Sequence, residues 1–124
     1  MGRSQREKGK RGERQAAKAL ADVTGLEARR GVQYQGGPDS PDIDVSNLYG
    51  MHWEVKYQER ESVRLWMEQA QRDAGDLVPV LLHRRNNKPW LVTIPLERVN
   101  EFSARLAEAI ASQISTVGPA ELPG

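Results

Sequence analysis

The sequence predicts an α/β domain with a central mixed β-sheet flanked by helices, in the element order α-β-β-β-α-β-β-α. Three observations predict this class. Apolar residues recur with a helical period in several segments, runs that alternate apolar and polar residues lie between them, and turns rich in Gly, Pro and Asn separate the runs. Because 124 residues can build one core but not two, we expect a single domain over residues 1–114, with a basic arm over 1–12 and a flexible tail over 115–124.

The first half of the chain is expected to hold one helix and three strands. The helix is expected to run from residue 4 or 9 to residue 23, and Gly25 is a favourable stop. The apolar positions that predict it recur at i, i+3, i+4 and i+7, namely Ala16, Ala19, Leu20 and Val23. The three strands are expected over residues 26–34, 42–46 and 51–58, with a Gly- and Pro-rich loop at 35–41.

The second half is expected to form a helix, a β-hairpin and a last helix. Ser62 is suited to cap the first of these helices, which should end at Ala74 before Gly75. The runs "VPVLLHRR" and "PWLVTIP", separated by the turn "NNK", are typical of a hairpin. An amphipathic stripe predicts the last helix, through Leu96, Val99, Phe102, Leu106 and Ile110.

Composition narrows the classes of function. The chain has no cysteine, which excludes disulfides, thiol catalysis and cysteine-ligated zinc. No apolar run reaches the length of a membrane span, and the N-terminal residues lack the apolar stretch of a signal peptide. We therefore expect a cytoplasmic protein that does not enter a membrane.

The charge is unevenly distributed along the chain. Residues 1–18 hold seven Lys and Arg against two acids, a net charge of +5, whereas the whole chain carries +1. The remainder is therefore mildly acidic. A basic segment on such a body suits the phosphate backbone of a nucleic acid, because that attraction is electrostatic.

The stretch "PDIDVSNLYGMHWEVK", residues 41–56, concentrates carboxylates on two neighbouring runs. With strand periodicity, Glu54 and Lys56 point to the same side, about 6.6 Å apart along the strand. Carboxylate oxygens are the ligands of Mg²⁺, and a nearby lysine can stabilise the charge that develops on a phosphate. The intervening Val55 leaves its backbone carbonyl free to bind the metal. "EVK" alone is more typical of a solvent-exposed Glu/Lys pair than of a metal site. An Asp on the preceding run and Glu13 on the first helix change this balance in favour of a metal-dependent site.

These residues resemble a known family. "RGER" in the first helix, then Asp44, then Glu54-Val55-Lys56, resembles the PD-(D/E)xK nuclease superfamily, and within it the archaeal-type Holliday junction resolvases and their small phage-encoded relatives. "WEVKYQE", "EQAQRDAG" and "PVLLHRRNNKPWLVTIP" also resemble the phage relatives, so the similarity extends over most of residues 9–95.

The resemblance implies a restriction-endonuclease-like fold and a Mg²⁺-dependent endonuclease of branched DNA, with Mn²⁺ able to substitute. It implies Asp44 and Glu54 as metal ligands together with the Val55 carbonyl, Lys56 as the catalytic lysine, and Glu13 as an accessory acid. A homodimer, a role in DNA recombination or repair, and, for a phage-encoded protein, the host cytoplasm are implied as well.

Two aspartates compete for the first ligand position. The literal "PD" favours Asp42, and strand parity does not separate the two because they lie two residues apart. Asp44 lies ten residues before Glu54, which better matches the short hairpin typical of the phage relatives. We choose Asp44 and keep Asp42 as its rival.

Several further residues are candidates for weaker roles. Gln69 shares a helix face with Trp66 and is a candidate accessory residue, although a single glutamine at such a place is more often a hydrogen-bonded buried amide. The chain has His52 and His83 as its two histidines, and the sequence predicts no zinc site from them. The expected DNA-binding residues are basic and lie on the first helix, on the first strand and at the hairpin tip: Lys10, Arg11, Arg14, Arg30, Arg84, Arg85 and Lys88.

The function expected from the sequence is therefore cleavage of branched DNA, with a Holliday junction resolvase as the leading hypothesis. One alternative is a repair or restriction-type nuclease that acts on duplex ends or flaps. The other is a DNA-binding module without cleavage, which the converging acids argue against.

Overall fold

A computed structural model of the chain describes residues 3–31 and 40–121, with side chains over 7–31 and 40–113. The predicted order of elements is confirmed. The elements are α1 (Arg3–Thr24), β1 (Ala28–Arg30), β2 (Ile43–Val45), β3 (Met51–Tyr57), α2 (Val63–Ala74), β4 (Val78–Arg84), β5 (Leu91–Thr93), a 3₁₀ turn η2 (Leu96–Arg98) and α3 (Val99–Glu121). The end of the strand expected over 26–34 and most of the loop after it lie outside the described residues.

The sheet is mixed and consists of two pieces. β3 and β4 pair in parallel, and β4 and β5 form the expected antiparallel hairpin. β1 and β2 form a separate antiparallel ribbon. The two pieces meet where the Asp42 N–H donates to the Trp53 carbonyl at 2.8 Å, just before β2 begins. β2 therefore has β1, and not β3, as its ladder partner, and this junction is where the acidic residues gather.

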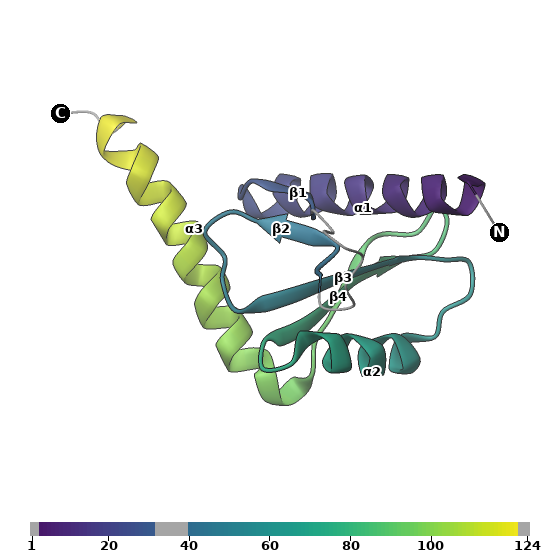
Figure 1. The fold of residues 1–124 in the computed structure, drawn as a ribbon. Helices are drawn as coiled ribbons and strands as arrows, with labels where there is room; N and C mark the ends of the chain where they lie inside the picture. The colour runs from purple at the N-terminus through teal and green to yellow at the C-terminus, as the bar shows by residue number, and fades with distance from the viewer. Residues whose placement is uncertain (1–2, 32–39, 122–124) are drawn as a thin grey trace.

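Helices cover both faces of the three-stranded sheet (Figure 1). The larger core lies between this sheet, α1, the β1–β2 ribbon and the inner side of α3, and includes Leu20, Leu26, Trp53 and Val80. The smaller core lies under α2, where Trp66 and Ala70 pack on Leu81. Alternate residues of β3 and β4 therefore enter different cores, as strand geometry requires.

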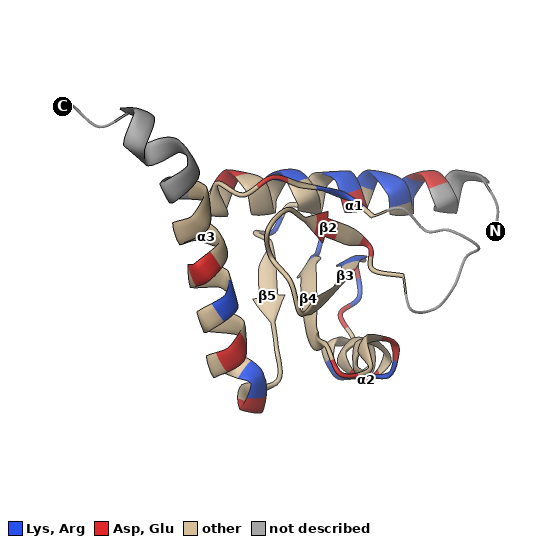
Figure 2. Cartoon of the chain, turned by 60° about the vertical axis from the view of Figure 1, so that its left-hand side comes forward, with Lys and Arg blue, Asp and Glu red and all other residues tan. Residues whose placement is uncertain are grey.

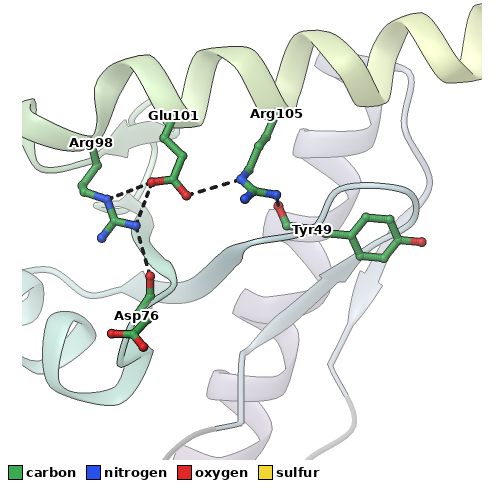
Figure 3. A network of polar contacts seen from close by, with 5 residues as sticks. All are labelled: Tyr49, Asp76, Arg98, Glu101 and Arg105. Atoms are coloured by element: carbon green, nitrogen blue, oxygen red, sulfur yellow. Dashed lines mark hydrogen bonds and ion pairs between the residues drawn. The ribbon is translucent and has the colours of Figure 1, made fainter.

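A polar network fixes the start of α3 against the body of the domain (Figure 3). Glu101 accepts from Arg98 Nη2 at 2.9 Å and from Arg105 Nε at 3.3 Å. The two arginines also donate to the backbone carbonyls of Asp76 and Tyr49, at 3.1 and 3.4 Å. The hydrogen bond from Arg98, with the charges of both arginines, lowers the pKa of Glu101. One carboxylate thus joins α3 to the segments that precede β3 and β4.

The ends of α1 and the start of α2 lie close to the predicted positions, but the predicted capping hydrogen bond is not formed. Gly25 and Gly75 follow α1 and α2 with positive φ angles of 77° and 59°, as a helix stop favours. Ser62 precedes α2 as expected, but its side chain makes no capping hydrogen bond. α3 continues to Glu121, beyond residue 114, the expected end of the domain. None of the described helices combines the length and apolar character that a membrane span requires.

Candidate metal centre

Strand β3 presents three polar side chains to α2. His52, Glu54 and Lys56 alternate with Met51, Trp53 and Val55, which enter or border the larger core. Lys56 Nζ lies 3.4 Å from the Gln69 Oε1 on α2, so the accessory position suggested for Gln69 is beside the lysine. The shared parity of Glu54 and Lys56 places both at the same side of the sheet, as the sequence predicted.

Asp42 reaches this strand from the bend before β2. Its backbone N–H donates to the Trp53 carbonyl, and its Oδ2 accepts from the Val55 N–H at 2.8 Å. The N–H and C=O of one strand residue point to the same edge of the strand. The Val55 carbonyl is therefore directed to the edge that Asp42 occupies, which is the orientation that a metal-ligating carbonyl needs.

Asp42 is the most perturbed carboxyl group at this junction. Burial, which is the largest effect, and the negative charges of Glu54 and Glu13 together raise its pKa to about 7, against the lowering effect of the Val55 N–H. Lys56 opposes these effects only in part. Three carboxyl groups thus interact around one lysine, and a divalent cation would relieve their repulsion. The oxygen donors of Asp42, Glu54 and the Val55 carbonyl fit a hard cation such as Mg²⁺.

Asp44 lies elsewhere. It is exposed, pairs across the ribbon with Arg29, and lines a cavity of about 380 Å³ with Tyr49 and Met51. Strand parity relates Asp42 and Asp44 only if both lie on one strand, but β2 begins at Ile43 and Asp42 precedes it in a bend. The geometry therefore favours Asp42 over Asp44 as the partner of Glu54.

Glu13 approaches the same region from α1. Its Oε1 accepts from Arg30 Nε at 2.7 Å, so the arginine expected to contact DNA is held by the accessory acid. A cavity of about 440 Å³ lies between α1 and the end of β3 and is lined by Glu13, Lys56 and Tyr57 among others. A Cβ at Gly12 would lie 3.2 Å from the Tyr57 Cβ, so this glycine permits the close approach of helix and strand.

The basic residues fall into two groups. Lys10, Arg11 and Arg14 lie on the N-terminal half of α1, where Figure 2 shows much of that helix's positive charge. At the hairpin end, the Arg84 guanidinium lies 5.2 Å from the ring centre of Tyr57 and 5.5 Å from that of Trp90. Arg85 and Lys88 are exposed at the turn.

Two residues beside Glu54 were not among the site residues predicted from the sequence. His52 is 1% exposed, and its Nε2 lies 3.0 Å from Glu54 Oε1. Asp73 on α2 has a carboxylate oxygen near both, since one ligand atom from each of the three residues lies within 4.8 Å of the others. The available signal was spacing, because Asp73 follows Gln69 by one helical turn.

One comparison with known families gave a match. Residues 4–119 match the family model described as "Phage putative PDDEXK endonuclease". The chain belongs to this family. A search of curated proteins and a search of solved structures found no match. The resemblance to the PD-(D/E)xK superfamily and to its small phage-encoded members is therefore confirmed, and the mixed sheet between helices is consistent with the restriction-endonuclease-like fold. The phage PDDEXK endonucleases form a nuclease family, which makes DNA the partner class of this chain.

Proposed function

We propose that this phage PDDEXK-family protein is a Mg²⁺-dependent endonuclease that hydrolyses phosphodiester bonds in branched DNA. Four-way junctions are the proposed substrate, a homodimer the acting form, and recombination or repair in the host cytoplasm the setting. One observation carries the proposal. Asp42, the Val55 carbonyl edge, Glu54 and Lys56 converge where the β1–β2 ribbon leaves β3.

In this proposal Asp42 takes the ligand position first given to Asp44. Asp42, Glu54 and the Val55 carbonyl would hold the cation, with the Asp42 carboxylate already positioned by the Val55 N–H. When bound, Mg²⁺ supplies Lewis-acid polarisation of the phosphate and lowers the pKa of a bound water; Mn²⁺ offers the same chemistry. The raised pKa of Asp42 is consistent with a carboxyl group whose natural counter-charge is a metal ion.

Lys56 would act on the phosphate and on the attacking water. Its ammonium group stands on the same side of β3 as Glu54 and is oriented by Gln69. A fixed positive charge at this place stabilises the charge that develops on the phosphate oxygens during attack. Glu13, which lines the cavity beside Lys56 and accepts from Arg30, is proposed as the accessory acid.

The site opens toward the basic surface of the domain. The cavity beside Lys56 is also lined by Lys8 of α1, and further exposed basic residues lie on the same helix. A DNA backbone that reaches the cavity would contact Lys8 there. Arg11 and Arg14, on the solvent-exposed face of α1, and Arg85 and Lys88 at the hairpin turn are proposed as further phosphate contacts.

A cleavage assay with matched aspartate variants tests the proposal. Wild-type protein should nick a four-way junction in Mg²⁺ in preference to linear duplex, and should not nick it in EDTA. Asp42→Asn should lose at least about 100-fold in rate, since it removes the charge of a ligand with little change in shape. Asp44→Asn is the matched control and should cut within about twofold of wild type, because removing an exposed charge outside the site leaves the barrier unchanged within a few tenths of a kcal/mol.

The opposite pattern would return the ligand role to Asp44. Equal cleavage of junctions, flaps and duplex ends would replace the resolvase by the repair or restriction-type nuclease, and binding without any cleavage would leave a DNA-binding module.

A further inference from the structure

A second group of metal-ligating side chains lies beneath α2. The ligand atoms of His52, Glu54 and Asp73 all lie within 4.8 Å of one another. Two of these residues are carboxylates and the third is a buried histidine, so the group can offer oxygen and nitrogen donors to one point. This group differs from the proposed nuclease centre, to which His52 and Asp73 contribute nothing; the two groups share Glu54 alone.

The group exists because α2 and β3 run with matching periodicity. Two residues along a strand advance about 6.6 Å, and one helical turn advances about 5.4 Å. Gln69 lies opposite Lys56, and one turn later Asp73 lies opposite Glu54 and His52. The register of the helix on the strand thus fixes where the Asp73 carboxylate points.

The electrostatics of the group favour a bound cation. Glu54 is buried and Asp73 is partly buried, and their carboxylates lie close together. No lysine or arginine side chain of residues 7–31 and 40–113 forms an ion pair with Asp73. Like charges at this range repel unless a positive charge separates them. The nearest imidazole, His52, offers its Nε2 3.0 Å from Glu54 Oε1.

That 3.0 Å separation suits two ligands of one metal ion. With metal–ligand bonds of about 2.1 Å, neighbouring ligand atoms around zinc lie roughly 3.0–3.5 Å apart. A small rotation of the Asp73 side chain would bring its oxygen from the present limit of 4.8 Å into the same range. Imidazole nitrogen selects zinc and related transition metals, whereas Mg²⁺ prefers oxygen alone.

We infer that His52, Glu54 and Asp73 form a second metal site, selective for Zn²⁺ or a similar borderline divalent ion. The site binds such an ion whether or not the chain is a nuclease. A consequence for catalysis rests on the proposed function. Because Glu54 serves both groups, a Glu54 carboxylate bound to Zn²⁺ offers less negative charge to Mg²⁺, so Zn²⁺ in this site inhibits Mg²⁺-dependent cleavage.

Direct binding tests the site without any cleavage. Zn²⁺ is titrated into the metal-stripped full chain in competition with a chromophoric chelator. Wild-type protein should bind one ion, and Asp73→Asn should weaken binding at least about tenfold while it preserves the shape of the side chain. Asp76→Asn is the matched control, since it removes an exposed carboxylate close behind α2 and should leave the affinity unchanged. Asp42→Asn should keep its Zn²⁺ affinity.

Three results would overturn the inference. Equal affinities of wild type and Asp73→Asn would remove Asp73 from the site. Loss of Zn²⁺ binding in Asp42→Asn would place the ion in the nuclease centre. In cleavage assays, the Zn²⁺ concentration that halves the rate should be at least about tenfold higher for Asp73→Asn than for wild type, in proportion to the loss of affinity. Equal inhibition of the two proteins would overturn the competition for Glu54. Circular dichroism of each variant confirms that it folds.

Discussion

At the scale of single residues, the aspartate proposed as the metal ligand is distinguished by burial and not by strand parity. Asp42 accepts from the Val55 N–H and lies among the charges of Glu54, Glu13 and Lys56, whereas Asp44, two residues later, is exposed. A carboxyl group held at such a place is destabilising while it is ionised and uncompensated. The site is therefore built at the expense of the stability of the metal-free fold.

This cost has a predictable pH dependence. Asp42 titrates near 3.8 in the unfolded chain and near 7 in the folded one, so between these values the folded state holds the extra proton. Raising the pH through this window therefore destabilises the metal-free protein, by up to roughly 4 kcal/mol at about 1.4 kcal/mol per pKa unit. Asp42→Asn should be as stable as wild type near pH 4 and more stable at pH 8.

Urea unfolding in EDTA at a series of pH values measures the difference between the two proteins. Asp44→Asn, whose site is exposed, should show no comparable trend. A difference between Asp42→Asn and wild type that stays constant from pH 4 to 8 would mean that Asp42 ionises in the fold as it does in water.

At the scale of elements, periodicity predicted most of the fold and about half of the site. The stripe of Ala16 and Leu20 and the alternation through Trp53 depend on local geometry, so the sequence alone predicts α1 and β3. The partner of β2 depends on which chain segments meet, and no local pattern carried that information. The proximity of Asp73 to Glu54 likewise depends on the register of α2 on β3, which only the packed structure defines.

The basic half of α1 is proposed to hold the DNA backbone. Arg11 and Arg14 are exposed and form no ion pair with the described side chains, whereas Lys18, at the other end of the same helix, is paired with Asp22 at 3.0 Å. Replacing both arginines by alanine should weaken binding of junction and duplex alike. The slope of log affinity against log salt should flatten by about 0.9 for each phosphate that the protein no longer neutralises.

Fluorescence anisotropy in EDTA, over a range of salt concentrations, measures these slopes. Lys18→Ala removes one charge from the same helix and serves as the control, with little expected change. An unaltered slope in the double variant would mean that this half of α1 is a solvated surface, and the phosphate-binding cations would have to come from the hairpin turn.

At the scale of the whole molecule, the outer strand of the hairpin is an apolar edge that the described residues leave uncovered. β4 is almost fully buried, but β5 pairs only with β4 among the described strands, and Leu91 and Val92 on it are 53% and 48% exposed. The stripe of α3 is largely used within the domain, since Phe102 and Leu106 pack on the larger core. An apolar edge strand of this kind pairs readily with a second chain.

Resolution of a four-way junction requires two symmetric nicks, so two active sites must be held in a fixed relation, and a two-fold dimer through β5 is the simplest arrangement. Sedimentation at micromolar concentration should report about 28 kDa, twice the 13.9 kDa of one chain. Val92→Lys should shift the protein to the monomer, because a charge on an edge strand blocks pairing. Val23→Lys alters a more exposed apolar residue at the end of α1 and should leave the dimer intact. A monomer that still cuts junctions would contradict the resolvase, because one active site cannot place paired nicks, and would favour a nicking or flap nuclease.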